Sequence, residues 1–485
     1  MHEAYDKQQL AAAIKNDLPE GLLQVARSAY RDPGLFDLEM RELFEKSWVY
    51  LAHESQLSGR GAFITTSLGL LPILVCRDDD QKIRAFINSC THRGSLVCRE
   101  AKGVTSFHTC PFHGWTFNTK GDLIGIPYER TGGYPEQFRK ESFGLKALPR
   151  LSMYRGLIFG SMVEEGASLE DWLGDAKVFI DLLCDQSKEG EIEVLPGVSS
   201  YQYKGNWKLQ CENQSDGYHV YATHGSYLET LRRRKVSAQP DQIRAMDFTG
   251  FSGADIEGGF FALENGHAVL WWDWSGQGAD NKPNAERYPQ YLEQWGQVKA
   301  DWMLGRARNL IIYPNLLLTD HASTQIRVIK PLAWDQTEVS IYCFGLKGES
   351  LTERGRRLRQ YEDFFNASGM ATPDDVAVFE FCHEGYASSD YIPWNDLSRG
   401  AKNLQKGANQ RARELGITPK WSGGNVEDEQ IMWAYAEFWQ SKLMAAIAGR
   451  LDGVPRSTLD LESGTTTVSG VERERAREGA TSPSS

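Results

Sequence analysis

The chain has 485 residues, more than one hydrophobic core usually supports, so we expect two or more domains. Its 53 Lys and Arg residues against 65 Asp and Glu give a net charge of −12, which argues against binding to nucleic acid or anionic lipid, because both require a basic surface. Eight dispersed cysteines, an N-terminus without an apolar core, and apolar runs far shorter than the roughly 20 residues of a membrane span predict a cytoplasmic protein.

The first part of the chain contains two kinds of segment. Residues 34–48 place apolar and aromatic side chains on one helical stripe, so we expect residues 1–48 to form a helical N-terminal segment. From 49 to 160, short β-branched and aromatic runs alternate with Gly, Asp and Asn turns. This pattern predicts an all-β domain.

A longer mixed region follows, from 161 to 463. The stretch "SLEDWLGDAKVFIDLLCDQ" predicts a helix capped by Ser168. Two more helical patterns lie near its C-terminal end, after four strand-like runs around 199–205, 259–274, 308–318 and 324–345. The chain is therefore expected to be α+β, and its polar tail, 464–485, is expected to be disordered.

Two short loops that end in glycine each contain one cysteine and one histidine. "CTHRG" supplies Cys90 and His92, and "CPFHGW" supplies Cys110 and His113. Four soft ligands at this spacing favour a metal site. The mixture in each loop suits a Rieske 2Fe–2S cluster, in which two thiolates hold one iron and two imidazoles hold the other. Structural zinc is the alternative, although zinc modules usually take both cysteines from one loop.

A Rieske cluster carries a single electron, so a second, catalytic metal site is expected. His219 and His224, in "ENQSDGYHVYATH", are five residues apart, which on an ideal helix directs their imidazoles about 140° apart. They can converge on one ion only if the helix is broken. Asp216 precedes His219 by three residues and could orient its ring through a hydrogen bond. Asn213, in the same stretch, is a further candidate catalytic residue.

Two histidines and one carboxylate leave open positions on ferrous iron where O₂ and a substrate can meet. The stretch "ATPDD" offers Asp374 or Asp375, and Asp375 is favoured. Glu380 and Glu384 are further candidates. Acidic residues at a helix start also serve as caps and dipole partners, which is the alternative interpretation.

Together these residues resemble the large (α) subunit of Rieske non-haem iron ring-hydroxylating oxygenases. "CTHRG", "CPFHGWTFN", "GNWKL", "ENQSDGYHVYATH" and "NASGMATPDD" occur in the family's order, and the likeness extends from Trp48 to about residue 430. "AHES", "ATPDD", "WNDLSRG" and "NGHAVLWW" make the chain most similar to the benzoate, toluate and anthranilate dioxygenase branch. It departs from that branch at Gly225 in "HGSY", where tryptophan usually follows the second histidine.

The resemblance implies an N-terminal Rieske domain, residues 49–160, and a catalytic domain of helix-grip type, residues 161–463, with an antiparallel sheet covered by helices. Residues 1–48 are expected to pack on the catalytic domain. It also implies one 2Fe–2S cluster and one mononuclear Fe(II), the latter held by His219, His224 and Asp375.

The resemblance further implies partners. In the family, Asp216 bridges to a Rieske histidine of the neighbouring subunit, so electrons cross between protomers. The expected assembly is an α trimer, or α₃β₃ with a small β subunit. Electrons are expected from NADH, through a flavin and 2Fe–2S reductase or a ferredoxin.

The implied reaction is dihydroxylation of a benzoate-like aryl carboxylate. A buried carboxylate needs a cationic or hydrogen-bonding partner, for which His267 and Arg327 are candidates. Other candidates for lining the substrate pocket are Asn309, Ile311, Leu318, Phe364 and Phe365. A Rieske monooxygenase acting on a salicylate, aniline or related aromatic would share every metal residue, whereas a pure electron-transfer protein would lack the second iron.

Overall fold

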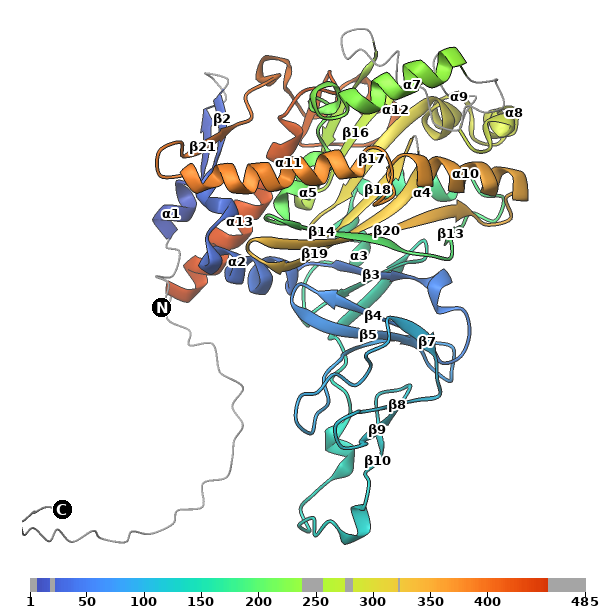
Figure 1. Cartoon of the computed structure of the whole chain (residues 1–485), viewed down its shortest axis with the longest axis vertical. Coiled ribbons are helices and arrows are strands. Elements are labelled where there is room, and N and C mark those ends of the chain that lie inside the picture. Colours follow the sequence, from blue (N-terminus) through green and yellow to red (C-terminus); the bar gives the residue numbers. More distant parts are fainter. Residues whose placement is uncertain (1–6, 18–21, 238–255, 275–281, 322, 452–485) are drawn as a thin grey trace, which may run out of the picture.

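The computed structural model describes residues 7–17, 22–237, 256–274, 282–321 and 323–451. The predicted tail, 464–485, lies outside these residues. The described chain is α+β, as predicted, with a small all-β part below a larger part in which helices cover an extended antiparallel sheet (Figure 1). No helix among the described residues is long and apolar enough to cross a membrane.

The all-β part contains three small antiparallel sheets. The first has the order β6 (Ile83–Ile87), β5 (Leu71–Arg77), β4 (Ala62–Leu68) and β7 (Lys102–Val104). The second has the order β10 (Leu123–Gly125), β9 (Thr116–Asn118) and β8 (Phe107–Thr109), and the third the order β11 (Arg150–Tyr154), β12 (Leu157–Ser161) and β3 (Val49–His53). The first two sheets enclose a core of their own, which includes Phe63, Phe86 and Trp115.

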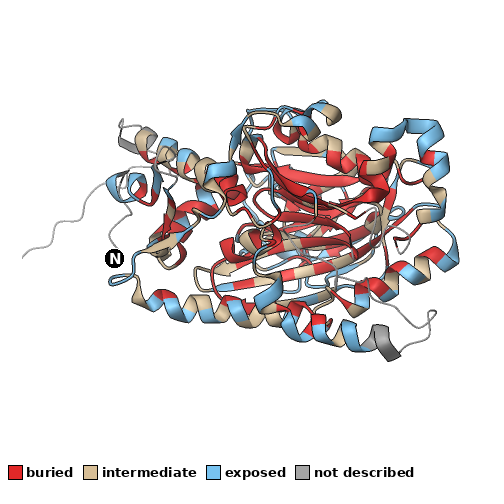
Figure 2. Cartoon of the chain, turned by 90° about the horizontal axis from the view of Figure 1, so that it is seen from above, coloured by how far each residue is buried: buried red, intermediate tan, exposed pale blue. Residues whose placement is uncertain are grey.

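One long antiparallel sheet organises the larger part. Its order is β13 (Ile192–Val194), β20 (Gln336–Leu346), β19 (Thr324–Ala333), β18 (Leu316–Asp320), β17 (Arg306–Ile312), β16 (Ala268–Asp273), β15 (Gly258–Ala262), β23 (Trp421–Gly423) and β22 (Gln405–Lys406). A further strand, β14 (Ser199–Lys204), pairs with the other half of β20. The central strands are buried along most of their length (Figure 2).

Helices cover the two faces of this sheet. In chain order they are α1 (Lys7–Ala11), α2 (Pro33–Glu39), α3 (Leu169–Leu173), α4 (Ala176–Cys184), α5 (Lys208–Gln214), α6 (Val220–Thr223), α7 (Gly225–Ser237), α8 (Tyr288–Trp295), α9 (Gln297–Ala300), α10 (Leu351–Asp363), α11 (Thr372–Gly385), α12 (Gln410–Leu415) and α13 (Ile431–Leu451). Helix α3 begins after Ser168, whose hydroxyl accepts a hydrogen bond from the Asp171 amide, as predicted.

Successive strand residues point to opposite faces, so the sheet divides the apolar side chains between two cores. Leu270 and Trp272 of β16 belong to the core that includes residues of α5, α7, α11 and α13. Trp271 and Leu310 belong to the core under α3 and α4. The two faces of the sheet therefore present different residues of the same strands. Only the residues on one face can reach a site that lies on that face.

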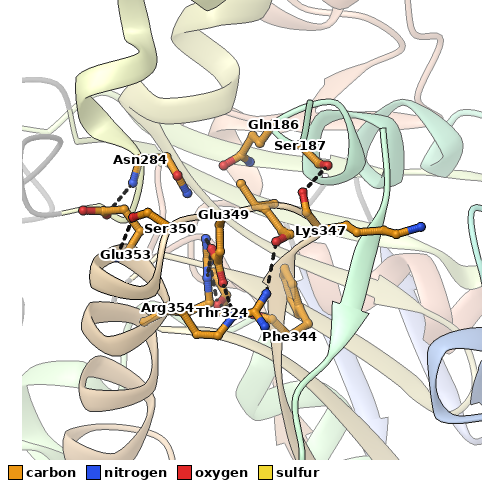
Figure 3. Close-up of polar contacts among 12 residues, drawn as sticks. Gln186, Ser187, Asn284, Thr324, Phe344, Lys347, Glu349, Ser350, Glu353 and Arg354 are labelled. Carbon is orange, nitrogen blue, oxygen red and sulfur yellow. Dashed lines mark hydrogen bonds and ion pairs between the residues drawn. The ribbon is translucent and has the colours of Figure 1, made fainter. Parts of the chain in front are cut away.

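A buried ionic cluster fixes α10 to the sheet. Figure 3 shows Glu349, shortly after the end of β20, near Arg354 and Thr324. The Arg357 guanidinium bonds both the Glu349 carboxylate, at 2.9 Å, and the Thr324 hydroxyl, at 2.9 Å. Nearby, the Glu353 carboxylate accepts a hydrogen bond from the backbone N–H of Asn284 at 2.8 Å. These contacts anchor α10 where the chain returns toward α11.

The N-terminal segment packs on the larger part through both a hairpin and a helix. The hairpin of β1 (Ile14–Asp17) and β2 (Leu22–Ala26) pairs with β21 (Trp394–Asp396). After α2 and a π-helical turn, Met40–Phe44, the chain enters the all-β part. The carboxylate of Glu39 accepts hydrogen bonds from the Trp207 indole at 2.8 Å and the Trp439 indole at 2.7 Å, and it also pairs with Lys208. One buried carboxylate thus joins α2, α5 and α13.

Candidate functional site: two metal centres and a cavity

The two Cys–His loops have the same backbone design. One lies between β6 and β7, the other between β8 and β9. In each, a glycine with positive φ closes the turn and returns its amide to the carbonyl of the cysteine: Gly94 to Cys90 at 2.8 Å, and Gly114 to Cys110 at 3.0 Å. Only glycine adopts this left-handed conformation without strain, which explains the residue that ends each motif.

These loops present their ligands as two pairs. The Cys90 and Cys110 thiols are buried side by side, and burial raises the pKa of Cys90. The His92 and His113 rings lie outside them, with centroids 4.6 Å apart, and the Trp115 indole stacks on His92. Two pairs fit two irons better than a single tetrahedral zinc.

The second centre depends on a broken helix. Helix α5 ends at Gln214, and α6 is a single turn that begins after His219 and ends before His224. Asp375, in the first turn of α11, lies between the two rings: its Oδ1 is 3.2 Å from His224 Nε2 and 3.5 Å from His219 Nε2. In the described chain, these three residues form the group able to hold one metal ion. Asn213 Nδ2 donates to the same Oδ1 at 3.0 Å.

Further carboxylates contact the outer nitrogens of both rings. Asp216 Oδ2 lies 3.3 Å from His219 Nδ1, and Asp374 Oδ2 lies 3.5 Å from His224 Nδ1. Asp374 therefore contacts the outer nitrogen of the His224 ring, whereas the adjacent Asp375 lies between the two histidine rings. Glu380, a rival candidate, instead accepts from the Lys204 amide at 3.2 Å. Both rings have the carboxylate contact that commonly fixes the tautomer of a metal-binding histidine.

The electrostatics of the triad favour a cation. Burial alone would raise the pKa of Asp375, but contacts with His219 and His224 hold it well below its usual range. Burial alone would lower the pKa of His219, but Asp216 and Asp375 raise it to about 10. The second oxygen of Asp375, Oδ2, is buried and makes no hydrogen bond within the described structure. An ionised carboxylate with a free lone pair beside two imidazoles suits a metal ion.

A cavity of about 670 Å³, including its mouth, opens beside this triad. The sheet contributes Leu270, Trp272, Asn309 and Arg327, and His321 joins them from the end of β18. Burial lowers the pKa of His321 to about 3, so its ring is neutral at physiological pH. The helical side is mostly apolar and contains Val220, Tyr227, Leu228, Phe364 and Phe365. The cavity combines apolar walls with a few polar groups, as small-molecule sites usually do.

Four of the seven predicted pocket residues line this cavity, namely Asn309, Arg327, Phe364 and Phe365. The other three, Leu318, Ile311 and His267, do not line it. Leu318 points to the opposite face of the sheet, in the core under α4, because strand residues alternate. Ile311 shares the face of Asn309 but lies two residues further along β17, packed between Ala268 and Leu317. Neither side chain reaches the cavity.

His267 is the third residue that does not line the cavity. It is fully buried, its Nε2 lies 3.1 Å from the Trp172 carbonyl, and its Nδ1 accepts from the Tyr313 amide at 3.1 Å. Burial lowers the pKa of His267 to about 4. Both ring nitrogens are engaged within the protein, so this neutral histidine cannot recognise a carboxylate in the cavity.

Sequence reasoning missed several lining residues, among them Leu270, Trp272, Tyr227, Leu228 and His321. The signal for two of them was available, because Leu270 and Trp272 alternate on β16, and Leu270 faces Asn309 in the ladder. Gly225 does not line the cavity. It is exposed at the start of α7, and a side chain there would meet nothing within 4 Å.

Comparisons with known proteins agree with this architecture. Residues 47–149 match the Rieske [2Fe-2S] domain, and residues 170–415 match the catalytic domain of the ring hydroxylating alpha subunit. The chain is 43% identical over 440 residues to the toluate 1,2-dioxygenase subunit alpha of Pseudomonas putida, which covers 90% of this chain and 95% of that protein. It is 41% identical over 448 residues to the 2-halobenzoate 1,2-dioxygenase large subunit of Burkholderia cepacia, covering 91% and 94%.

A third relative, the anthranilate 1,2-dioxygenase large subunit of Acinetobacter baylyi, is 40% identical over 448 residues, covering 91% of this chain and 92% of that protein. Among solved structures, naphthalene 1,2-dioxygenase from Rhodococcus sp. bound to indole superposes with a TM-score of 0.73 at 25% identity. That superposition covers 90% of this chain and 98% of the other.

Proposed function

Because the chain belongs to the family of Rieske ring-hydroxylating oxygenase α subunits, we propose that it dihydroxylates a benzoate-like aryl carboxylate. Toluate, 2-halobenzoate and anthranilate, named for three relatives at 40–43% identity, are all aryl carboxylates. The observation that carries the proposal is the triad of His219, His224 and Asp375 at the wall of a cavity with apolar sides.

The residues of both centres fit the metals that this family uses. His219, His224 and Asp375 would hold the mononuclear iron, and three protein ligands leave positions open for O₂ and substrate. When bound, this iron supplies the reductive activation of O₂; overall, an arene, O₂, two electrons and two protons give a cis-dihydrodiol. Cys90, His92, Cys110 and His113 would hold the 2Fe–2S cluster.

The protein's own groups position this chemistry. Asn213 donates to the Asp375 oxygen that faces both imidazoles and so fixes the carboxylate in one rotamer. Asp216 and Asp374 orient the two rings from outside. Phe364 and Phe365, with ring centroids 3.9 Å apart, supply a rigid apolar wall against which a substrate ring can pack. The apolar wall would hold the substrate ring beside the triad.

We also propose that electrons reach this triad from a neighbouring subunit. In Figure 1 the loops beside β8 and β9 lie at the lower end of the molecule, whereas α5 and α11 lie near the top. Asp216 contacts His219 from the outer side, and in this proposal its carboxylate would bridge to His92 or His113 of another protomer. We expect an α trimer, alone or with a small β subunit, that receives electrons from NADH through a reductase or ferredoxin in the cytoplasm.

The test is product analysis with isotopically labelled O₂. The iron-replete protein, supplied with NADH and a flavin and 2Fe–2S reductase, should convert benzoate to a cis-diol that carries both labelled oxygen atoms. A phenol with one labelled oxygen would instead identify a monooxygenase. Absence of any oxygenated product from benzoates, salicylates and anilines would refute the proposal.

Two adjacent aspartates provide a matched pair for testing the metal site. Asp375→Ala should retain the cluster's visible spectrum but hold two irons per chain in place of three, with loss of turnover. Asp374→Ala should still bind the third iron, about 10- to 100-fold more weakly, because it removes only a contact behind His224. Equal iron content in the two variants would contradict the assignment of Asp375.

A further inference from the structure

Arg327 is a buried cation at the cavity wall. It lies on β19, is 2% exposed and lines the cavity beside the triad. The neighbouring buried arginines pair with acids inside the protein, Arg308 with Asp320 and Arg357 with Glu349. None of the ion pairs among the described residues involves Arg327. A buried charge is costly without a counterion, so this position suits an anion that arrives with a ligand.

The contacts that Arg327 does make hold its guanidinium in one orientation. Nε donates to Gln325 Oε1 at 2.9 Å, and Nη2 donates to Thr372 Oγ1 at 3.4 Å. The Thr372 hydroxyl donates in turn to the Phe365 carbonyl at 3.1 Å, which leaves its oxygen free to accept from Arg327. The Phe365 ring lies 4.7 Å from the guanidinium carbon and packs against the group.

A guanidinium has five N–H donors, and these two hydrogen bonds use two of them. The remaining donors belong to Nη1 and Nη2, the pair of nitrogens that binds a carboxylate through two parallel hydrogen bonds. Arg327 is therefore oriented by neutral partners alone, with donors left over for a carboxylate. Lysine, with one compact ammonium, could not reproduce this geometry.

The position of Thr372 relates Arg327 to the metal triad. Thr372 and Asp375 both lie in the first turn of α11, three residues apart, so their side chains are neighbours on one helix face, about 5–6 Å apart at Cβ. A carboxylate bound by Arg327 would thus lie within about one ring's length of the triad. In a benzoate the carbon that bears the carboxylate is ring carbon 1, and the names of the relatives place their reactions at carbons 1 and 2.

We propose that Arg327 binds the substrate's carboxylate through two parallel hydrogen bonds and thereby selects anionic benzoates over neutral arenes. This inference rests on the proposed function and names the specificity-determining residue of the same site. Gln325, Thr372 and Phe365 act as positioning residues, because each contacts the guanidinium and none carries charge.

The experiment measures binding without turnover. Calorimetric titration of the anaerobic, iron-replete protein with benzoate and with benzamide, its neutral analogue, should show benzoate bound more tightly by the wild type. Arg327→Met should weaken benzoate binding by at least about 30-fold, since hydrogen bonds to a charged group are lost, while benzamide affinity changes less than about threefold. The cluster's visible spectrum reports whether the variant is folded.

Gln325→Glu is a second variant that leaves the arginine in place. The new carboxylate would pair with Arg327 Nε inside the protein and compete with the substrate's charge, so benzoate binding should weaken about tenfold while benzamide binding is retained. This variant decides the question if Arg327→Met fails to fold.

Three outcomes would overturn the role of Arg327: unchanged benzoate affinity in either folded variant, parallel loss of both ligands, or a wild type that binds benzamide as tightly as benzoate. The first outcome leaves the proposed function intact if the wild type still forms the labelled diol from benzoate. A wild type that binds benzoate through Arg327 yet oxygenates no arene would instead refute the proposed function alone.

Discussion

Glu212 is a half-buried carboxylic acid one residue before Asn213. Burial raises its pKa from the usual 4.5 to about 7, and nearby Asp216 and Glu429 add to the rise, although the Tyr30 hydroxyl and Lys208 partly oppose it. Tyr30 donates its hydroxyl hydrogen to the Glu212 carboxyl. Glu212 therefore retains its proton at a pH where exposed glutamates have lost theirs.

This residue predicts a pH-dependent stability. Between about pH 4.5 and pH 7 the folded protein keeps the proton on Glu212 while the unfolded chain releases it, so the contribution of Glu212 to stability falls as pH rises through this window. Glu212→Gln should therefore stabilise the protein relative to wild type by about 3 kcal/mol at pH 8, but by little at pH 5. Urea unfolding of both proteins at the two pH values measures the difference. A gap that does not change with pH would show that Glu212 ionises normally.

At the scale of elements, Glu39 joins parts of the chain that are up to 400 residues apart. Its buried carboxylate is the shared acceptor for groups from α2, α5 and α13, and one of its partners, Lys208, is itself buried. Removing the Glu39 carboxylate leaves the Lys208 ammonium and the indole N–H groups of Trp207 and Trp439 without their acceptor in the protein interior. Such orphaned groups cost more than the hydrogen bonds themselves contribute.

We predict that Glu39→Ala destabilises the protein by roughly 3–5 kcal/mol, the usual cost of breaking a buried ion pair. Lys347→Ala is the control, because it removes only exposed contacts, with Glu189 and Glu191, and should cost less than about 1 kcal/mol. Denaturant unfolding followed by tryptophan fluorescence compares the two. Equal losses would mean that Glu39 does not hold these helices together.

Sequence patterns predicted local features well and distant pairings poorly. Each Cys–His loop is complete within five residues, and the placement of His219 and His224 at helix ends follows from their spacing once both are taken to bind one ion. Placement of Leu318 failed because alternation reveals two faces without saying which one borders a cavity. That choice depends on the ladder, where Asn309 pairs with Leu270 and Thr319, and on which helices cover each face.

At the scale of the whole molecule, the two metal centres of one chain lie in different parts, and Asp216 stands on the outer side of His219 with its side chain 19% exposed. A partly exposed carboxylate that contacts a metal-binding ring can accept a hydrogen bond from outside its own chain. The proposed electron path across protomers therefore depends on assembly as much as on either centre.

Oligomers that mix two inactive variants test whether electrons cross between chains. Asp216→Ala should retain three irons per chain and lose at least about 100-fold in turnover, and Cys110→Ser, which lacks the cluster, should also be inactive. Co-expression of the two variants should restore part of the activity, because a chain with an intact cluster then adjoins a chain with an intact Asp216. If the mixture stays as inactive as each parent, electron transfer is not carried between chains in this way.

The alternation of the sheet has a practical consequence for changing what the enzyme accepts. Positions 270, 272, 309 and 327 face the cavity, whereas the intervening positions 269, 271 and 308 pack into the opposite core or its ion pairs. Mutant libraries restricted to every second residue of these strands should diversify substrate range with little loss of folded protein. Libraries that vary the intervening positions instead should mostly yield aggregated protein, because those side chains are packed in the opposite core.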